Sequence, residues 1–178
     1  IPFKDVYFTS ILRDEKGRKL SKSLGNSPDP LDLIEQYGAD AVRFSILLIS
    51  PQGMDVLFSA DRMELGRNFM NKLWNAARFV KMNTPSTELL PEMNEIETEF
   101  KLPEKWIISR LNNTIMEVNR RLNKFQFNEA VKVIYDFTWS DYCDWMIEIS
   151  KISFYGEDIK RKKCFQVVSV SVLKQILC

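Results

Sequence analysis

From Ser59 to the end of the chain, apolar residues recur about every 3.6 positions, which is the period of an α-helix with one buried face. Such a helix is stable only when its apolar face packs against another element. The spacing predicts four helices, over residues 59–82, 103–124, 128–151 and from about 157 onward. Consecutive amphipathic helices of this kind predict an antiparallel helix bundle.

The apolar faces of these helices define a candidate core. On the first helix, which Ser59 is expected to cap, the inward residues are Leu65, Phe69, Leu73, Ala76, Ala77 and Val80. On the second helix they are Ile107, Ile108, Leu111, Ile115 and Val118. Between these two helices, residues 84–102 are predicted to form a polar connection that contains Pro85 and Pro91.

The first fifty residues have a different character. β-Branched and aromatic residues predict a strand over 6–12, and the run Asp14-Glu15-Lys16-Gly17 predicts a turn. An exposed loop is expected to follow, up to residue 30. Asp29 as a cap and Gly38 as a stop then predict a helix over 30–37.

A second short helix is predicted over residues 39–48, with Ala41, Phe44, Ile46 and Leu47 inward. The expected fold class is therefore mainly α. A small α/β part over residues 1–58 is predicted to precede a helix bundle over residues 59–178.

Composition excludes several classes of function. The chain contains no histidine, which excludes histidine acid–base catalysis and histidine-ligated metal sites. Its 25 basic and 24 acidic residues give a net charge of +1, so any binding of nucleic acid must come from a local patch. Cys143, Cys164 and Cys178 form no metal-binding or disulfide pattern.

No apolar run approaches the ~20 residues that cross a bilayer, so we expect a cytoplasmic protein with no membrane partner. The chain begins at Ile1 and ends in the apolar pattern VLKQILC. Both ends are expected to be cut from something longer.

The most informative stretch for chemistry is the loop KLSKS, residues 19–23. Two ammonium groups and two hydroxyl groups lie within five residues, ahead of a glycine and a helix start. Lysine suits phosphate oxygens as a mobile point charge, and hydroxyls add hydrogen bonds to the same oxygens. Fixed cations there would lower the barrier of a reaction in which negative charge grows on a phosphoryl group. The alternative is an ordinary solvated loop.

KLSKS and the following LGNSPDPLDLIEQYGADAVRFSIL resemble the KMSKS region of class I aminoacyl-tRNA synthetases, with Leu20 in place of the usual methionine. In that family the loop closes over ATP while the amino-acid carboxylate attacks the α-phosphate and pyrophosphate leaves. The resemblance implies that Lys22 contacts the ATP phosphates and Lys19 assists, both as catalytic residues. It also implies that Ser21 and Ser23 shape the loop at the ATP site, and that Gly25 and Asn26 end it.

Two further segments, RNFMNKLWNAARF at 67–79 and WSDYCDW at 139–145, resemble valyl-tRNA synthetases. The resemblance implies a protein that activates valine with ATP and Mg²⁺, transfers it to tRNA(Val) and acts as a monomer. This chain would hold no metal of its own. It lacks the HIGH motif and the valine pocket, so we expect it to be inactive alone. The alternatives are an isoleucyl- or leucyl-tRNA synthetase, or a non-catalytic RNA-binding module.

By the same resemblance, the helices carry the anticodon-binding surface. The candidate tRNA-binding residues are Arg67, Asn71, Lys72, Asn75, Arg78, Phe79, Arg120 and Arg121. Arginine, asparagine and an exposed ring can read unpaired bases. The structural alternatives are that the asparagines join helices, that Phe79 lies in the core and that the arginine pair favours a helix dipole.

Two other groups favour structural roles. The aromatic residues Phe137, Trp139, Tyr142 and Trp145 could stack on bases, but their helical spacing favours a place in the core. The acidic residues Asp141, Asp144 and Glu148 are interpreted as structural polar contacts.

Overall fold

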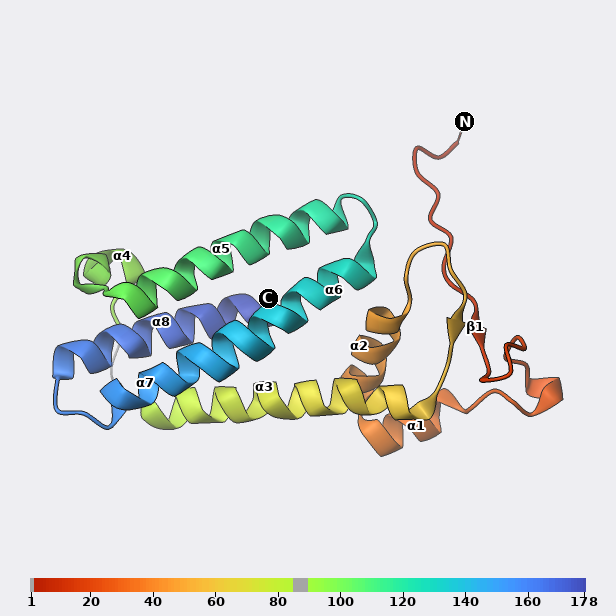
Figure 1. Cartoon of the computed structure of the whole chain (residues 1–178), viewed down its shortest axis with the longest axis horizontal. Helices are drawn as coiled ribbons and strands as arrows, with labels where there is room; N and C mark the ends of the chain where they lie inside the picture. Colours follow the sequence, from red (N-terminus) through yellow and green to blue (C-terminus); the bar gives the residue numbers. More distant parts are fainter. Residues whose placement is uncertain (1, 85–89) are drawn as a thin grey trace. The chain divides into compact units, whose positions relative to one another are not determined.

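The computed structural model describes residues 2–84 and 90–178 (Figure 1). The chain forms two compact units. One contains residues 1–70 together with 117–133, and the other contains 71–116 together with 134–178. Each unit has its own apolar core. The structure is mainly helical with a small sheet, which confirms the expected fold class, while the predicted domain boundary after residue 58 stays a prediction.

The sheet of the first unit is small. Strand β1 (Leu12–Arg13) pairs in parallel with β2 (Val56–Leu57), with Leu12 opposite Val56. The predicted strand over 6–12 was wrong except for its last residue. Val6 and Phe8 are 66% and 78% exposed, and in the described part of the chain no strand pairs with residues 6–10. β-Propensity alone does not form a strand without a neighbour to pair with.

Two short helices follow the loop region, α1 (Pro30–Tyr37) and α2 (Ala39–Ile49). The carboxylate of Asp29 accepts a hydrogen bond from the Leu31 amide at 2.8 Å, as expected of a helix cap. Gly38 separates the helices at φ 90°, a conformation that favours glycine. Both helix predictions are confirmed, α2 being one residue longer than expected.

The inward face of α2 differs in part from the prediction. Leu47 was expected inside but is 41% exposed, whereas Ser45 is fully buried and accepts a hydrogen bond from the Gly66 amide at 3.0 Å. A Cβ on Gly66 would lie 2.2 Å from the Ala41 carbonyl oxygen. Glycine at 66 is therefore what allows the next helix to approach α2 this closely.

That helix, α3, runs over Met63–Asn83 after a 3₁₀ turn at Ala60–Arg62. Ser59 makes no side-chain capping hydrogen bond, so its predicted role was wrong. Phe69, Ala76 and Val80 are buried as expected, but Leu65 is 47% exposed. The core of the first unit contains Leu33, Val42, Phe58 and Met63 instead.

Helices α5 (Leu102–Leu122) and α6 (Phe127–Asp136) are joined by a tight turn. Phe125 in this turn has φ 58°, the left-handed region that non-glycine residues rarely adopt. The centroid of its ring lies 6.3 Å from that of Tyr7, and the Phe127 ring lies 5.2 Å from Tyr7 and 6.3 Å from Phe125, so the three rings form one cluster. Within the first unit, these rings hold the chain that leads into β1 against the α5–α6 turn.

The second unit buries the larger core. The predicted helix over 128–151 is confirmed as one helical run, formed by α6, a π-helical segment (Phe137–Met146) and α7 (Ile147–Phe154). The final helix, α8 (Ile159–Leu177), is capped by Asp158, which accepts from the Arg161 amide at 3.0 Å. On α5, Ile107 and Leu111 are buried as predicted, while Ile115 is 37% exposed.

The predicted polar connection over 84–102 contains a short helix, α4 (Met93–Ile96), and a 3₁₀ turn (Glu97–Glu99). Phe100, which follows them, is buried in the second core. Pro85 lies outside the described residues. Within the described ranges, no helix combines the length and apolar character needed to cross a membrane.

One buried ion pair crosses the second unit. The carboxylate of Glu104, on the first turn of α5, is fully buried and accepts from the Lys101 amide at 3.0 Å and from the Arg161 guanidinium on α8. Arg161 also lies over the Phe165 ring, 5.1 Å from its centroid. A buried carboxylate that loses its cation is strongly destabilising, because the charge remains desolvated.

Replacement of Arg161 by methionine should therefore lower the free energy of unfolding by about 3 kcal/mol, since Glu104 would keep a buried charge without its partner. Urea unfolding followed by circular dichroism measures this. The matched control is the exposed Lys160→Met, which should cost less than about 0.5 kcal/mol. Equal losses in the two variants would show that the ion pair does not hold α5 to α8.

Candidate functional site

The KLSKS loop begins as an extension of the sheet and ends in a tight turn. Lys19 forms an antiparallel bridge with Arg13, and the Leu20 amide donates to the Leu12 carbonyl at 3.2 Å. Residues Lys22–Leu24 form a 3₁₀ turn, which the Gly25 amide closes on the Lys22 carbonyl at 3.1 Å. Gly25 has φ 63°, so the sequence places a glycine where the backbone becomes left-handed.

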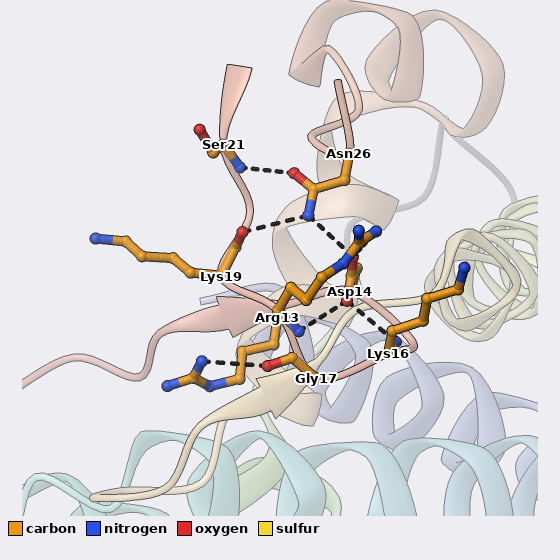
Figure 2. A network of polar contacts seen from close by, with 8 residues as sticks. Arg13, Asp14, Lys16, Gly17, Lys19, Ser21 and Asn26 are labelled. Atoms are coloured by element: carbon orange, nitrogen blue, oxygen red, sulfur yellow. Dashed lines mark hydrogen bonds and ion pairs between the residues drawn. The ribbon is translucent and has the colours of Figure 1, made fainter. Parts of the chain in front are cut away.

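The charged groups of the loop face solvent. Lys19 and Lys22 are both exposed, and neither ammonium group has a hydrogen-bond or ion-pair partner within the described residues. Figure 2 shows the Lys19 side chain extending away from the polar network at the base of the loop. The hydroxyl groups of Ser21 and Ser23 lie 2.7 Å apart. The two lysines thus face solvent while the two hydroxyl groups bond to each other, and the role of all four residues at ATP phosphates stays a prediction.

The base of the loop is held by a hydrogen-bond network around Asp14 and Asn26 (Figure 2). The Asn26 amide nitrogen donates to Asp14 Oδ2 at 2.9 Å and to the Lys19 carbonyl at 3.3 Å, while its Oδ1 accepts from the Ser21 amide at 2.9 Å. Asp14 also accepts from the Lys16 and Arg18 amides at 3.0 and 2.8 Å, and from Arg18 Nε at 2.8 Å. Hydrogen bonds from Asn26 and then from Arg18 hold the pKa of Asp14 well below its usual range.

Sequence reasoning interpreted Asp14 only as a turn residue and Asn26 only as the end of the loop. The pair is separated by twelve positions. An aspartate that begins a four-residue turn ahead of a polar loop was the available signal, because such side chains bond to backbone amides two residues on. The signal gave no indication that Asp14 would also reach Asn26.

An open hollow of about 460 Å³ lies beside this network. Arg18, Asn26 and Pro28 line it from the loop side, and residues 58–60 line it from the segment between β2 and α3. Pockets for small ligands have volumes of about 300–1,000 Å³. The hollow therefore has room for part of a small molecule next to the loop.

The candidate tRNA-binding residues on α3 fall into two groups. Arg67, Lys72 and Phe79 already have partners within the protein. Arg67 pairs with Glu64 at 3.3 Å, and Lys72 bonds to Asp144 while its ammonium lies 4.0 Å from the centre of the Trp139 ring. The half-buried Phe79 ring lies 5.8 Å from the ring of Phe154.

The second group, Asn71, Asn75 and Arg78, is exposed. In the part of the chain that the structure describes, Arg78 has no carboxylate partner. Trp74, between these residues in sequence, is 73% exposed and was not among the candidates. The second half of α3 therefore presents amide, guanidinium and indole groups to solvent, which are groups that can bind unpaired bases.

The candidate pair Arg120 and Arg121 binds to Glu117 one turn earlier. Arg120 Nη2 and Arg121 Nε lie 2.5 and 2.7 Å from the Glu117 carboxylate, and Arg121 Nη1 lies 3.3 Å from Gln126 Oε1. Hydrogen bonds from Arg120 and then Arg121 lower the pKa of Glu117 to about 2. Arg121 thus also braces the turn that contains Phe125.

The aromatic residues after position 136 differ in how deeply they are buried. Phe137 and Tyr142 are buried in the second core, as the helical spacing favoured, but Trp145 is 61% exposed. Trp139 is half-buried and its ring stacks on that of Tyr135, with the ring centroids 5.5 Å apart.

The acidic residues of this segment form structural contacts, as interpreted from the sequence. Asp141 binds Arg110 at 2.8 Å, Asp144 binds Lys72, and Glu148 binds Lys151 at 2.6 Å. Residues 2–84 and 90–178 contain no cluster of three or more acidic or cysteine side chains arranged to hold a metal ion.

Two family descriptions match the sequence. Residues 1–59 match class I tRNA synthetases (I, L, M and V), and residues 104–178 match the anticodon-binding domain of tRNA ligases.

Curated relatives match nearly the whole chain. It is 52% identical to valine–tRNA ligase of Fusobacterium nucleatum over 162 residues, 91% of this chain and 18% of that protein. It is 47% identical to valine–tRNA ligase of Bacillus cereus over 176 residues, 99% of this chain and 20% of that protein. The chain thus spans about a fifth of the length of these relatives.

Solved structures share the fold. Mycobacterium tuberculosis methionyl-tRNA synthetase in complex with methionyl-adenylate matches with a TM-score of 0.74 and 22% identity, over 94% of this chain and 33% of that chain. A LeuRS–tRNA–LeuAMS complex from Agrobacterium radiobacter matches with a TM-score of 0.64 and 20% identity, over 98% of this chain and 21% of that chain.

Proposed function

Because the chain belongs to the class I aminoacyl-tRNA synthetases and matches part of valine–tRNA ligases, we propose that it is the segment of such a ligase that binds ATP phosphates and the tRNA anticodon. The complete enzyme would activate valine with ATP and transfer it to tRNA(Val). The names of the curated relatives support valine over isoleucine and leucine.

The observation that carries the ATP role is the ammonium group of Lys22, which is exposed and has no partner among the described residues, on a short turn whose base is fixed by hydrogen bonds. In amino-acid activation the carboxylate of valine attacks the α-phosphorus of ATP, a P–O bond forms, and pyrophosphate leaves as the bond to the β-phosphate breaks. Negative charge redistributes over the phosphate oxygens in the transition state. An ammonium group that contacts these oxygens most closely in the transition state stabilises that charge more than it stabilises bound ATP.

Lys19 would assist from the strand side of the loop, and the two serines would hold the tip in shape. Mg²⁺ would enter with ATP as part of the substrate, bound to the phosphate oxygens. The sequence contains no histidine and so no HIGH motif. We therefore propose that this segment does not form valyl-adenylate alone, and that the remainder of the ligase supplies the valine pocket and the rest of the ATP site.

The tRNA role is supported by the exposed groups on α3. Asn71, Asn75 and Arg78 can donate hydrogen bonds to unpaired bases, and Arg78 can also neutralise a phosphate. We assign secondary RNA contacts to Lys72, Phe79, Arg67 and the Arg120–Arg121 pair. Each of these residues would have to share or leave a partner within the protein to contact RNA.

In the complete ligase, Lys22→Ala should lower kcat of valine-dependent pyrophosphate exchange by roughly 100-fold, because a contact that strengthens in the transition state is lost. KM for valine should change less than threefold. Isotope exchange from labelled pyrophosphate into ATP measures both constants. Lys4→Ala, which removes an exposed lysine outside the loop, is the control and should leave kcat unchanged. An unchanged kcat in Lys22→Ala would reject the role given to Lys22.

Arg78→Gln in the complete ligase should weaken tRNA(Val) binding and reduce the slope of log K against log salt by about 1, since one phosphate contact is lost. Filter binding over a salt series measures both quantities. The control is Arg110→Gln, an arginine on α5 already paired with Asp141. If the two variants have the same affinity and salt slope, the exposed face of α3 is not an RNA contact.

A further inference from the structure

The two ends of the KLSKS loop meet at the side chain of Asn26, which in turn bonds to the carboxylate of Asp14 outside the loop. On the entering side, the Lys19 carbonyl and the Ser21 amide bond to the side chain of Asn26. Asn26 lies where the chain leaves the loop, and the nitrogen of its side-chain amide donates to Asp14 Oδ2 at 2.9 Å. The loop is thus closed at its base by one asparagine, and that asparagine is held by one aspartate (Figure 2).

We propose that Asp14 is a positioning residue for amino-acid activation, which acts through Asn26 to fix the base of the loop and so to set where Lys22 meets the ATP phosphates. This inference rests on the proposed function of the loop. Asp14 itself lies in the turn before the loop and would touch neither ATP nor valine.

The hydrogen-bond directions require these residue types. Each contact of the Asp14 carboxylate comes from a donor: the Lys16 and Arg18 amides, the Arg18 guanidinium and the Asn26 amide nitrogen. A carboxylate, which only accepts, satisfies all of them, whereas an asparagine at 14 would offer one acceptor oxygen instead of two. Asn26 is fixed in turn, because its nitrogen faces two acceptors while its oxygen faces an amide donor.

The charges around Asp14 explain why the carboxylate is stable in this place. Its side chain is only 14% exposed, and the Arg18 guanidinium lies 2.7 Å from Oδ2. Arg13, on the other side of the turn, is bound to Asp55 and to the Gly17 carbonyl. Arg18 is therefore the cation that pairs with Asp14. Charge-assisted hydrogen bonds of this kind are roughly twice as strong as neutral ones.

The arrangement separates a fixed base from a free tip. The amides of Lys16, Arg18 and Ser21 are all bonded to side chains of the network. The side chains of Lys19 and Lys22 have no partner in the described ranges and can follow the phosphates of ATP. Displacement of a catalytic group by about 1 Å can cost roughly 100-fold in rate, so a loose base would lower kcat even with Lys22 intact.

The test is a double-mutant cycle in the complete ligase, with pyrophosphate exchange as the assay. Asp14→Asn should lower kcat by roughly 10- to 100-fold while KM for valine changes less than threefold. Glu15→Gln removes the same charge from the neighbouring exposed position and should leave kcat within about twofold. If Asp14 acts through Lys22, Asp14→Asn combined with Lys22→Ala should be no slower than Lys22→Ala alone.

Asn26→Ala provides a second route to the same base. It should lower kcat as Asp14→Asn does, and the two substitutions together should have no further effect. Thermal unfolding of each variant is measured as a control. At least one of the two variants should be fully folded at the assay temperature, so that its lower kcat does not come from unfolding.

Full activity in Asp14→Asn, or losses that multiply with those of Lys22→Ala, would overturn the positioning role and leave the proposed function intact. A fully active Lys22→Ala would instead overturn the proposed function and the positioning role with it.

Discussion

Burial of one apolar face per helix is the constraint on which both units depend. In the second unit the larger polar groups that enter the core have partners, while the hydroxyl groups of Thr138 and Ser169 are buried without one in the described residues. Glu104 binds Arg161, and the Tyr142 hydroxyl donates to the Ser169 carbonyl at 2.8 Å. In the first unit, Ser45 and Gly66 allow α2 and α3 to touch along their backbones. Each unit thus has its own packed core, and the candidate functional side chains lie outside these cores.

The KLSKS loop is held in place by hydrogen bonds rather than by burial of an apolar face. It has no core beneath its tip, and hydrogen bonds to Asp14 and Asn26 take the place of burial. This arrangement leaves the lysine ammonium groups exposed and without a partner in the described residues, as the proposed ATP role requires. On α3 the same distinction separates residues that join helices, such as Lys72, from exposed ones, such as Arg78. A side chain that already has a strong partner within the protein stabilises the fold. It must share or leave that partner to bind a ligand.

Local signals predicted much of this structure. The Asp29 cap, the Gly38 stop and the helical periodicity gave α1, α2 and the long helices, because each depends on residues within one or two turns. The strand over 6–12 failed because only its last residue pairs, and the strand it pairs with, β2, lies more than forty residues away, beyond the reach of local propensity. The Asp14–Asn26 contact was missed for the same reason, since nothing in either residue's neighbourhood indicates the other. The loop's lysines were found because their motif resembles a known family.

Amide hydrogen exchange in the complete ligase, with and without ATP and valine, tests most directly whether a fixed base presents a free tip to ATP. The amides of residues 16–18 and 21 are hydrogen-bonded or lie in the network and should exchange slowly in both states. The amides of residues 22–24 should exchange rapidly in the free enzyme and become protected when ATP and valine bind. Equal exchange at base and tip in the free enzyme, or no protection of 22–24 by ATP and valine, would contradict the account.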